Sequence, residues 1–169
     1  MTEPHPATLP EARLLADCEI QRTRRSGPGG QHRNKVESAV VILHRPTGVL
    51  AEASERRSQA ENRQVALFRL RVNLALAVRR PVVEGSPPSP LWRSRCQGGR
   101  IAVNPQHDDF PSLLAEALDV LTACNLEPKT AAAALGCTSS QLTKFLQVEP
   151  QALLLINRSR ERLGWHRLK

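Results

Sequence analysis

The chain has 169 residues, 40% of them hydrophobic and 24% charged, and its formal net charge is +8. This length allows one ordinary domain or two small ones, and the basic balance favours an anionic partner. With three Phe, two Trp and no Tyr, base stacking on aromatic rings is not expected as the main binding mode, and Arg–phosphate contacts with recognition by shape are favoured.

Basic residues are concentrated in the first half. Residues 1–80 hold 14 Lys and Arg against 8 Asp and Glu, a net charge of +6, whereas residues 81–169 hold 10 against 8, a net charge of +2. We therefore expect the main nucleic-acid contact in the first half.

Cysteine spacing and hydropathy indicate no metal, no cofactor and no membrane segment. The cysteines do not form C-x-x-C and no His stands at zinc-finger spacing, and no apolar span or signal peptide is present. A cytoplasmic protein follows as the expectation. The cysteines are Cys18, Cys96, Cys124 and Cys137.

The chain is expected to begin with a flexible leader over residues 1–15, which holds three prolines. Residues 16–24 alternate weakly and predict a strand. This strand feeds the run Arg25-Ser26-Gly27-Pro28-Gly29-Gly30-Gln31-His32-Arg33-Asn34-Lys35. Its glycines and proline exclude a helix or strand interior and predict an exposed loop between cationic flanks.

The loop does not fit the common phosphate-binding patterns. A P-loop needs G-x-x-x-x-G-K-[ST] and a dinucleotide loop needs G-x-G-x-x-G, and the run matches neither. Taken alone, Gly29-Gly30-Gln31 is most often an ordinary turn.

Two strands and a long helix are predicted next. A strand that begins at Val36 or Ser38 and ends at Leu43 and a second strand over residues 49–53 are joined by a turn at Pro46-Thr47-Gly48. Ser58 and Glu61 form a capping box for a helix that ends before Pro81. The residues expected on its apolar face are Val65, Phe68, Val72 and Leu76, with Leu67, Leu70 and Leu74.

The second half is predicted to be helical. Residues 81–108 read as a Pro- and Gly-rich linker with a possible hairpin, and residues 109–169 as a helical domain. Within it, the short helix 130–135, Gly136 and a Thr138–Gln141 capping box have helix-turn-helix spacing. Structural packing or ribosome docking is favoured over DNA reading for this segment.

The loop and the series that follows it carry a specific resemblance. After the loop come Ser38-Ala39-Val40, then Pro46-Thr47-Gly48, then Arg57-Ser58-Gln59. This order closely resembles the peptidyl-tRNA hydrolase domain of class I peptide chain release factors, in which S-G-x-G-G-Q-H-x-N-[KR] precedes S-A-V, P-T-G and E-R-S-Q. It covers about a third of the chain and is far more specific than the tripeptide.

The resemblance implies the fold and the chemistry. The fold class is α+β: residues 16–80 form a small β-sheet with the GGQ loop and one long packed helix, and a small all-α, helix-turn-helix-like segment follows. Gly29, Gly30 and Gln31 would be catalytic in hydrolysis of the peptidyl-tRNA ester in the peptidyl-transferase centre. The Gln31 backbone N–H would stabilise the transition state, its side chain would position water, and a methyltransferase would modify Gln31.

Residue chemistry agrees with a positioning role for the loop. An amide does not titrate usefully, so Gln31 is not a general base, and His32 in a basic loop is more often a structural or phosphate-contacting residue. The further residues expected to contact RNA are Arg22, Arg24, Arg25, Ser26, His32, Arg33, Asn34, Lys35, Arg57, Arg63, Arg69, Arg158 and Arg160.

Departures from the family pattern favour ribosome rescue over stop-codon reading. No codon-reading module is recognised, Arg33 replaces an apolar residue, Arg56 replaces a common Glu, and a helical segment stands where rescue hydrolases have a basic tail. We expect a monomeric, codon-independent peptidyl-tRNA hydrolase acting on stalled ribosomes. The alternatives are a non-catalytic ribosome- or RNA-binding protein and, less favoured, a DNA-binding regulator.

Overall fold

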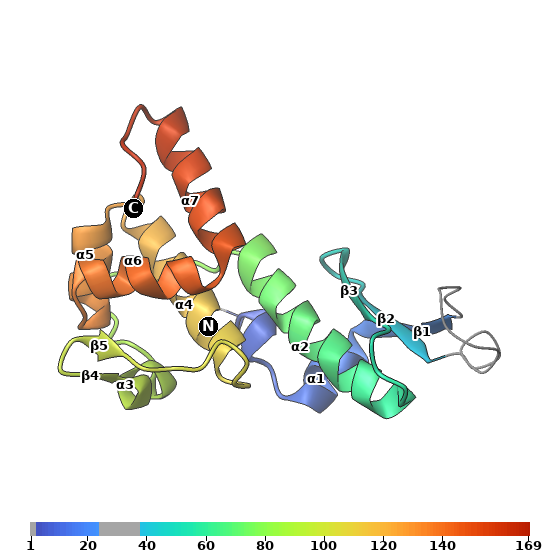
Figure 1. Cartoon of the computed structure of the whole chain (residues 1–169). Coiled ribbons are helices and arrows are strands. Elements are labelled where there is room, and N and C mark those ends of the chain that lie inside the picture. Colours follow the sequence, from blue (N-terminus) through green and yellow to red (C-terminus); the bar gives the residue numbers. More distant parts are fainter. Residues whose placement is uncertain (1–2, 24–37) are drawn as a thin grey trace. The chain divides into compact units, whose positions relative to one another are not determined.

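The computed structural model describes residues 3–23 and 38–169 of the chain. It confirms an α+β protein that divides into two compact units. We call Pro6–Val78 the sheet unit, and Arg79–Lys169 with the start of the chain up to His5 the helical unit. The ribbon is shown in Figure 1.

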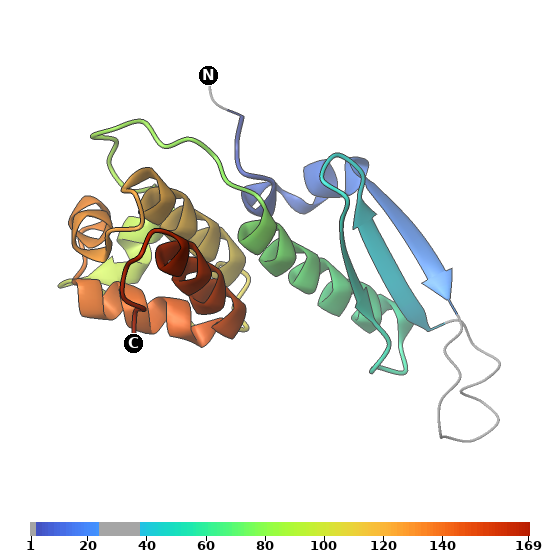
Figure 2. The same ribbon diagram turned by 90° about the horizontal axis from the view of Figure 1, so that it is seen from above.

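The sheet unit consists of one antiparallel sheet, two short N-terminal helices and one long helix. The sheet has the strand order β1-β2-β3, and helix α2 packs on β2 and β3 (Figure 2). Its elements are the 3₁₀ helix η1 (Pro6–Thr8), α1 (Glu11–Ala16), β1 (Cys18–Thr23), β2 (Ala39–His44), β3 (Val49–Ala53) and α2 (Gln59–Ala77).

Buried and more exposed side chains alternate along β2 and β3, and the buried ones contribute to the core of this unit. In β3, Ala51 and Ala53 are buried while Leu50 is exposed, and in β2 Val40 and Ile42 are buried. The small side chains of β3 let the backbone of α2 approach closely, because alanine adds little volume between helix and sheet. Strand β1 lies at the edge and is mostly exposed.

The structure corrects the expected flexible leader over residues 1–15. Residues 6–16 form η1 and α1, and Ala7 and Leu14 are fully buried. The Arg71 guanidinium donates a hydrogen bond of 2.8 Å to the Ala7 carbonyl, which ties η1 to α2. The prolines stand at and just before helix starts, where a missing N–H costs little.

The long helix begins as predicted, and three of the seven residues expected on its apolar face, Leu67, Leu70 and Leu74, are buried. Ser58 is its N-cap and accepts from the Glu61 N–H, and the helix ends at Ala77, before Pro81. Four residues of the expected apolar face, Val65, Phe68, Val72 and Leu76, are only half-buried. The side chains that pack fully are Asn62, Ala66, Leu67, Leu70, Leu74 and Ala75. Since the helix is apolar on several sides, periodicity alone does not select the packed face.

The helical unit contains the helix-turn-helix arrangement. Gly136 ends α5 with a φ of 68°, and the Thr138 side chain caps α6 by accepting from the Gln141 N–H at 3.2 Å. Both features were predicted. Its elements are α3 (Pro90–Arg95), β4 (Cys96–Gln97), β5 (Arg100–Ile101), α4 (Phe110–Ala123), α5 (Pro128–Leu135), α6 (Ser139–Val148) and α7 (Pro150–Arg162).

Much of the segment expected to be a linker takes part in this unit. The possible hairpin near Gly98-Gly99 is present as β4 and β5. Trp92 on α3 is 1% exposed and donates from its indole to the Leu135 carbonyl at 2.8 Å. Trp92 and Phe110 both meet Phe145 edge to face, with ring centroids 5.8 and 5.6 Å away, so a ring of this segment shares one core with rings of α4 and α6.

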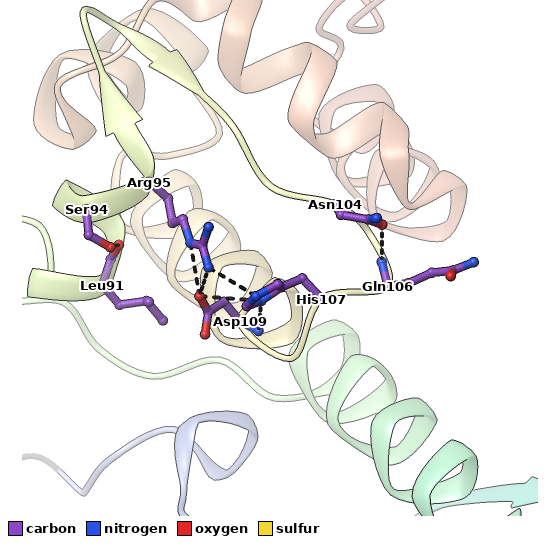
Figure 3. Close-up of polar contacts among 7 residues, drawn as sticks. All are labelled: Leu91, Ser94, Arg95, Asn104, Gln106, His107 and Asp109. Atoms are coloured by element: carbon purple, nitrogen blue, oxygen red, sulfur yellow. Dashed lines mark hydrogen bonds and ion pairs between the residues drawn. The ribbon is translucent and has the colours of Figure 1, made fainter. Parts of the chain in front are cut away.

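A polar cluster joins the same segment to the start of α4 (Figure 3). The Arg95 guanidinium donates to one Asp109 carboxylate oxygen from Nε at 3.0 Å and from Nη2 at 2.6 Å. The His107 ring lies against both groups, with Nε2 3.2 Å from Arg95 Nη2 and Nδ1 3.5 Å from the carboxylate. The Arg95 guanidinium thus binds partners within the helical unit, Asp109 and His107.

Within residues 3–23 and 38–169, neither a membrane-spanning helix nor a metal site is found. No helix there has the length and apolar character needed to cross a membrane. No group of three or more His, Cys, Asp and Glu side chains in these ranges is placed to hold a metal ion.

Candidate functional site

The predicted catalytic loop is joined to the end of the β1–β2 hairpin. Thr23 pairs with Ala39 in the last register position, whereas Cys18 pairs with His44 at the opposite end, beside the turn to β3. The chain that carries the GGQ sequence therefore leaves and re-enters the sheet at two adjacent strand ends. The predicted site residues that lie outside the described part are Arg24, Arg25, Ser26, Gly29, Gly30, Gln31, His32, Arg33, Asn34 and Lys35.

The connection between β3 and α2 lies near Ser38, where the described chain resumes after the predicted loop. Asn62 on α2 is fully buried, and its side-chain amide donates to the Ser38 carbonyl at 2.7 Å. The same amide donates to the Arg56 carbonyl at 2.9 Å, and its oxygen accepts from the Arg56 N–H at 2.9 Å. We call these three hydrogen bonds the Asn62 clamp. The clamp joins β2, the β3–α2 connection and α2.

Sequence analysis did not place Asn62 among the site residues. The available signal was a polar residue four positions after the Ser58 cap, on the same side of the helix as Ala66 and Leu70. A buried polar side chain at such a position needs partners, but the sequence does not indicate which backbone groups supply them.

Two of the predicted RNA-contacting arginines are exposed near the loop. Arg22 on β1 pairs with Val40, one register position from the strand end. Arg57 lies in the connection before α2, next to Arg56 of the clamp. Both are exposed, so their positions remain compatible with phosphate contact.

Two others take part in ion pairs on the surface. Arg63 lies 3.7 Å from a Glu11 carboxylate oxygen. Arg69 donates to both carboxylate oxygens of Glu55, at 2.5 and 3.3 Å, and to the Glu52 carbonyl at 2.8 Å. Hydrogen bonds from the backbone N–H groups of Ser54 and Glu55, with the Arg69 contact, lower the pKa of the Glu55 carboxyl. A phosphate near Arg69 would compete with this carboxylate.

In the helical unit, Arg158 is exposed, whereas the Arg160 side chain is buried and bound within the unit. Arg160 is 9% exposed, donates to the carbonyls of Leu126 and His166, and stacks 5.3 Å from the centroid of Trp165. Leu126 has a φ of 63°, a backbone conformation that branched side chains rarely adopt. Arg160 thus supports an unusual turn.

The basic residues after α7 fold back along this helix. Asn157 donates to the Leu168 carbonyl at 3.1 Å and accepts from the Leu168 N–H at 2.7 Å. Arg167 pairs with Glu161 at 3.3 Å. These contacts hold residues 167 and 168 against α7.

Comparison with known proteins finds a family and relatives that are similar to most of the sheet unit. Residues 14–84 match the RF-1 domain family. Peptide chain release factor 1 of Xylella fastidiosa (strain 9a5c) is 47% identical over 75 residues, which cover 40% of this chain and 21% of that protein. Peptide chain release factor 1 of Malacoplasma penetrans (strain HF-2) is 51% identical over 74 residues, with the same coverage.

A mitochondrial relative gives the same result. Peptide chain release factor 1-like, mitochondrial, of Rattus norvegicus is 48% identical over 58 residues, which cover 34% of this chain and 16% of that protein. The chain thus spans about a fifth of the length of the curated relatives that it matches. Residues 85–169, most of the helical unit, lie outside the family match.

Proposed function

Since residues 14–84 are an RF-1 domain of the class I release factor type, we propose that the protein hydrolyses the peptidyl-tRNA ester on the ribosome. The observation that carries the proposal is the domain match, which includes Gly29, Gly30 and Gln31 between two paired strands. The substrate would be the ester that joins a nascent peptide to P-site tRNA, and the partner would be ribosomal RNA of the peptidyl-transferase centre.

In this proposal the loop positions the reacting groups and stabilises the charge of the transition state. A backbone N–H of Gln31 aimed at the developing negative charge would lower the barrier by about 3–4 kcal/mol. Glycines before it allow the backbone to come close to the substrate, and the Gln31 side chain would restrict where water sits. Modification of Gln31 by a methyltransferase belongs to the same proposal.

We further propose that release is independent of the codon and serves stalled ribosomes. Two facts support this: the match is confined to residues 14–84, and the residues that follow form the helical unit. Because residues 163–169 pack on α7 through Asn157 and Arg160, we expect recognition of the ribosome to use folded surfaces of this unit. We expect the protein to act as a monomer.

The proposal is tested by release of labelled peptide from ribosomes that carry P-site peptidyl-tRNA. The A site would be empty, or would hold a stop codon or a sense codon. We expect similar release in all three states for the wild type, and a loss of about a hundredfold or more for Gln31→Ala and Gly30→Ala. Release only at stop codons would refute codon independence.

The second candidate is a non-catalytic protein that binds ribosomes or RNA. The net charge of +6 in residues 1–80 and the exposed Arg22 and Arg57 favour it as an alternative. Ribosome binding without release in any of the three states, even after methylation of Gln31, would establish this alternative and refute the hydrolase.

A further inference from the structure

We propose that Asn62 is a positioning residue for the peptide-release loop, an inference that rests on the proposed function. Asn62 lies on α2, in its first turn. Its amide holds the carbonyl of Ser38, the first described residue after the loop, at 2.7 Å. The clamp thus fixes the loop exit to the first turns of a helix that packs on the sheet.

The hydrogen-bonding capacity of the Asn62 amide is matched to its surroundings. Both Nδ2 hydrogens are used, one on Ser38 and one on Arg56, and Oδ1 receives the Arg56 N–H. Aspartate and leucine, which have a similar size, do not offer two N–H donors beside an acceptor. Since the residue is 0% exposed, water cannot replace these bonds without opening the packing.

The two strand ends at the loop are held in different ways. The entry side, at Thr23, is fixed by pairing with Ala39 on β2, and β1 is an edge strand that α2 does not cover. On the other side, Ala39 is held by its pairing with Thr23, and the adjacent Ser38 is held by the clamp. We therefore infer that the backbone at Ser38 is the more firmly held of the two described strand ends.

Small displacements at such a point matter for catalysis by positioning. A shift of about 1 Å in a reacting group can reduce the rate about a hundredfold. If the clamp positions the loop, its removal lowers the maximal rate of release without weakening attachment to the ribosome, because the exposed arginines remain in place.

The same helix offers a matched control. Asn73 also donates from its amide to a strand carbonyl, that of Leu50 on β3, at 2.9 Å. This bond lies on β3, where Leu50 pairs with Leu43, away from Ser38. Asn73→Ala removes one amide–carbonyl bond between α2 and the sheet but leaves the clamp intact.

The experiment compares the full-length wild type, Asn62→Ala, Asn62→Leu and Asn73→Ala. Asn62→Leu keeps the side-chain volume, so it serves if the alanine variant does not fold. Three quantities are measured: the release rate at saturating protein, the concentration that gives half this rate, and amide hydrogen exchange by NMR in the free protein. Thermal unfolding gives the folded fraction of each variant.

For both Asn62 variants we expect a fall in the saturating rate of about tenfold to a hundredfold, with the half-saturating concentration within about twofold of the wild type. The Arg56 amide should exchange at least about tenfold faster, because it loses its acceptor, while the Leu70 amide in α2 should not change. Asn73→Ala should leave all three quantities within about twofold.

Wild-type rates in folded Asn62 variants would overturn the positioning role, and so would a loss that the unfolded fraction fully accounts for. An unchanged Arg56 exchange rate would overturn the clamp itself. Failure of the wild type to release peptide would refute the proposed function instead, and the exchange comparison would still decide whether Asn62 anchors this part of the unit.

Discussion

Asp119 on α4 is a buried carboxylate beside two arginines. It is 6% exposed, accepts from the Arg80 N–H at 3.0 Å, and lies 3.7 Å from Arg79 Nη1. Burial raises its pKa to about 6, against the opposing effects of the Arg80 N–H and the Arg79 charge. The cost of removing the carboxylate from water thus outweighs the attraction of its neighbours.

This pKa predicts a dependence of stability on pH. The folded chain binds the Asp119 proton more tightly than the unfolded chain, in which the pKa is near 3.8. The stabilising contribution is therefore complete below about pH 4 and is lost as the pH rises through 6. A shift of this size corresponds to about 3 kcal/mol as an upper bound.

The measurement is urea unfolding at several pH values between 4 and 7.5 for the wild type and Asp119→Asn. The asparagine keeps an acceptor for the Arg80 N–H but does not titrate. We expect the variant to gain stability relative to the wild type as the pH rises. The exposed Asp108→Asn serves as control and should follow the wild type. Parallel curves for the wild type and Asp119→Asn would contradict the prediction.

At the scale of elements, the α5–α6 turn depends on one backbone conformation. Gly136 has a φ of 68° and closes α5, with its N–H on the Ala133 carbonyl and the Cys137 N–H on the Ala132 carbonyl. A Cβ built at Gly136 meets no atom within 4 Å. A side chain therefore fits in space, and any cost comes from the backbone conformation alone.

We predict that Gly136→Ala destabilises the helical unit by about 1–2 kcal/mol. Gly136→Asn should cost less, since asparagine tolerates the left-handed region better. Urea unfolding followed by tryptophan fluorescence measures both variants. Equal stability of all three proteins would show that the turn adjusts its conformation, contrary to this account.

At the scale of the whole molecule, each unit has its own core. Most buried residues of the sheet unit come from β2, β3 and α2, joined by Ala7 of η1 and Leu14 of α1, whereas most of those of the helical unit come from α3 to α7. Both tryptophans, Trp92 and Trp165, belong to the helical unit. Tryptophan fluorescence thus reports on one unit and circular dichroism on both.

We predict that the two units unfold in separate transitions. Leu70→Ala removes a fully buried side chain of α2 and should lower the stability of the sheet unit by about 2–5 kcal/mol. The transition seen by circular dichroism should then broaden or split, while the fluorescence transition stays at the wild-type urea concentration. An equal shift of both signals would show that the units unfold together.

The sequence by itself determined the α+β class, the RF-1 resemblance and the ends of most elements. Ser58, Gly136 and Thr138 mark helix boundaries through bonds to residues at most five positions away. Such features are readable because a cap or a turn depends on its own neighbours along the chain. The GGQ assignment rests on an ordered motif, which is equally local.

Only the tertiary structure decided how distant residues pair. The Asn62 clamp joins positions 38, 56 and 62, Arg160 bonds the carbonyl of Leu126, and Arg71 ties down the residues expected to form a flexible leader. Which side of α2 faces the sheet was also undetermined, since its apolar residues surround much of the helix. These outcomes depend on groups brought together by folding, and no periodicity or spacing rule encodes contacts between segments that are far apart along the chain.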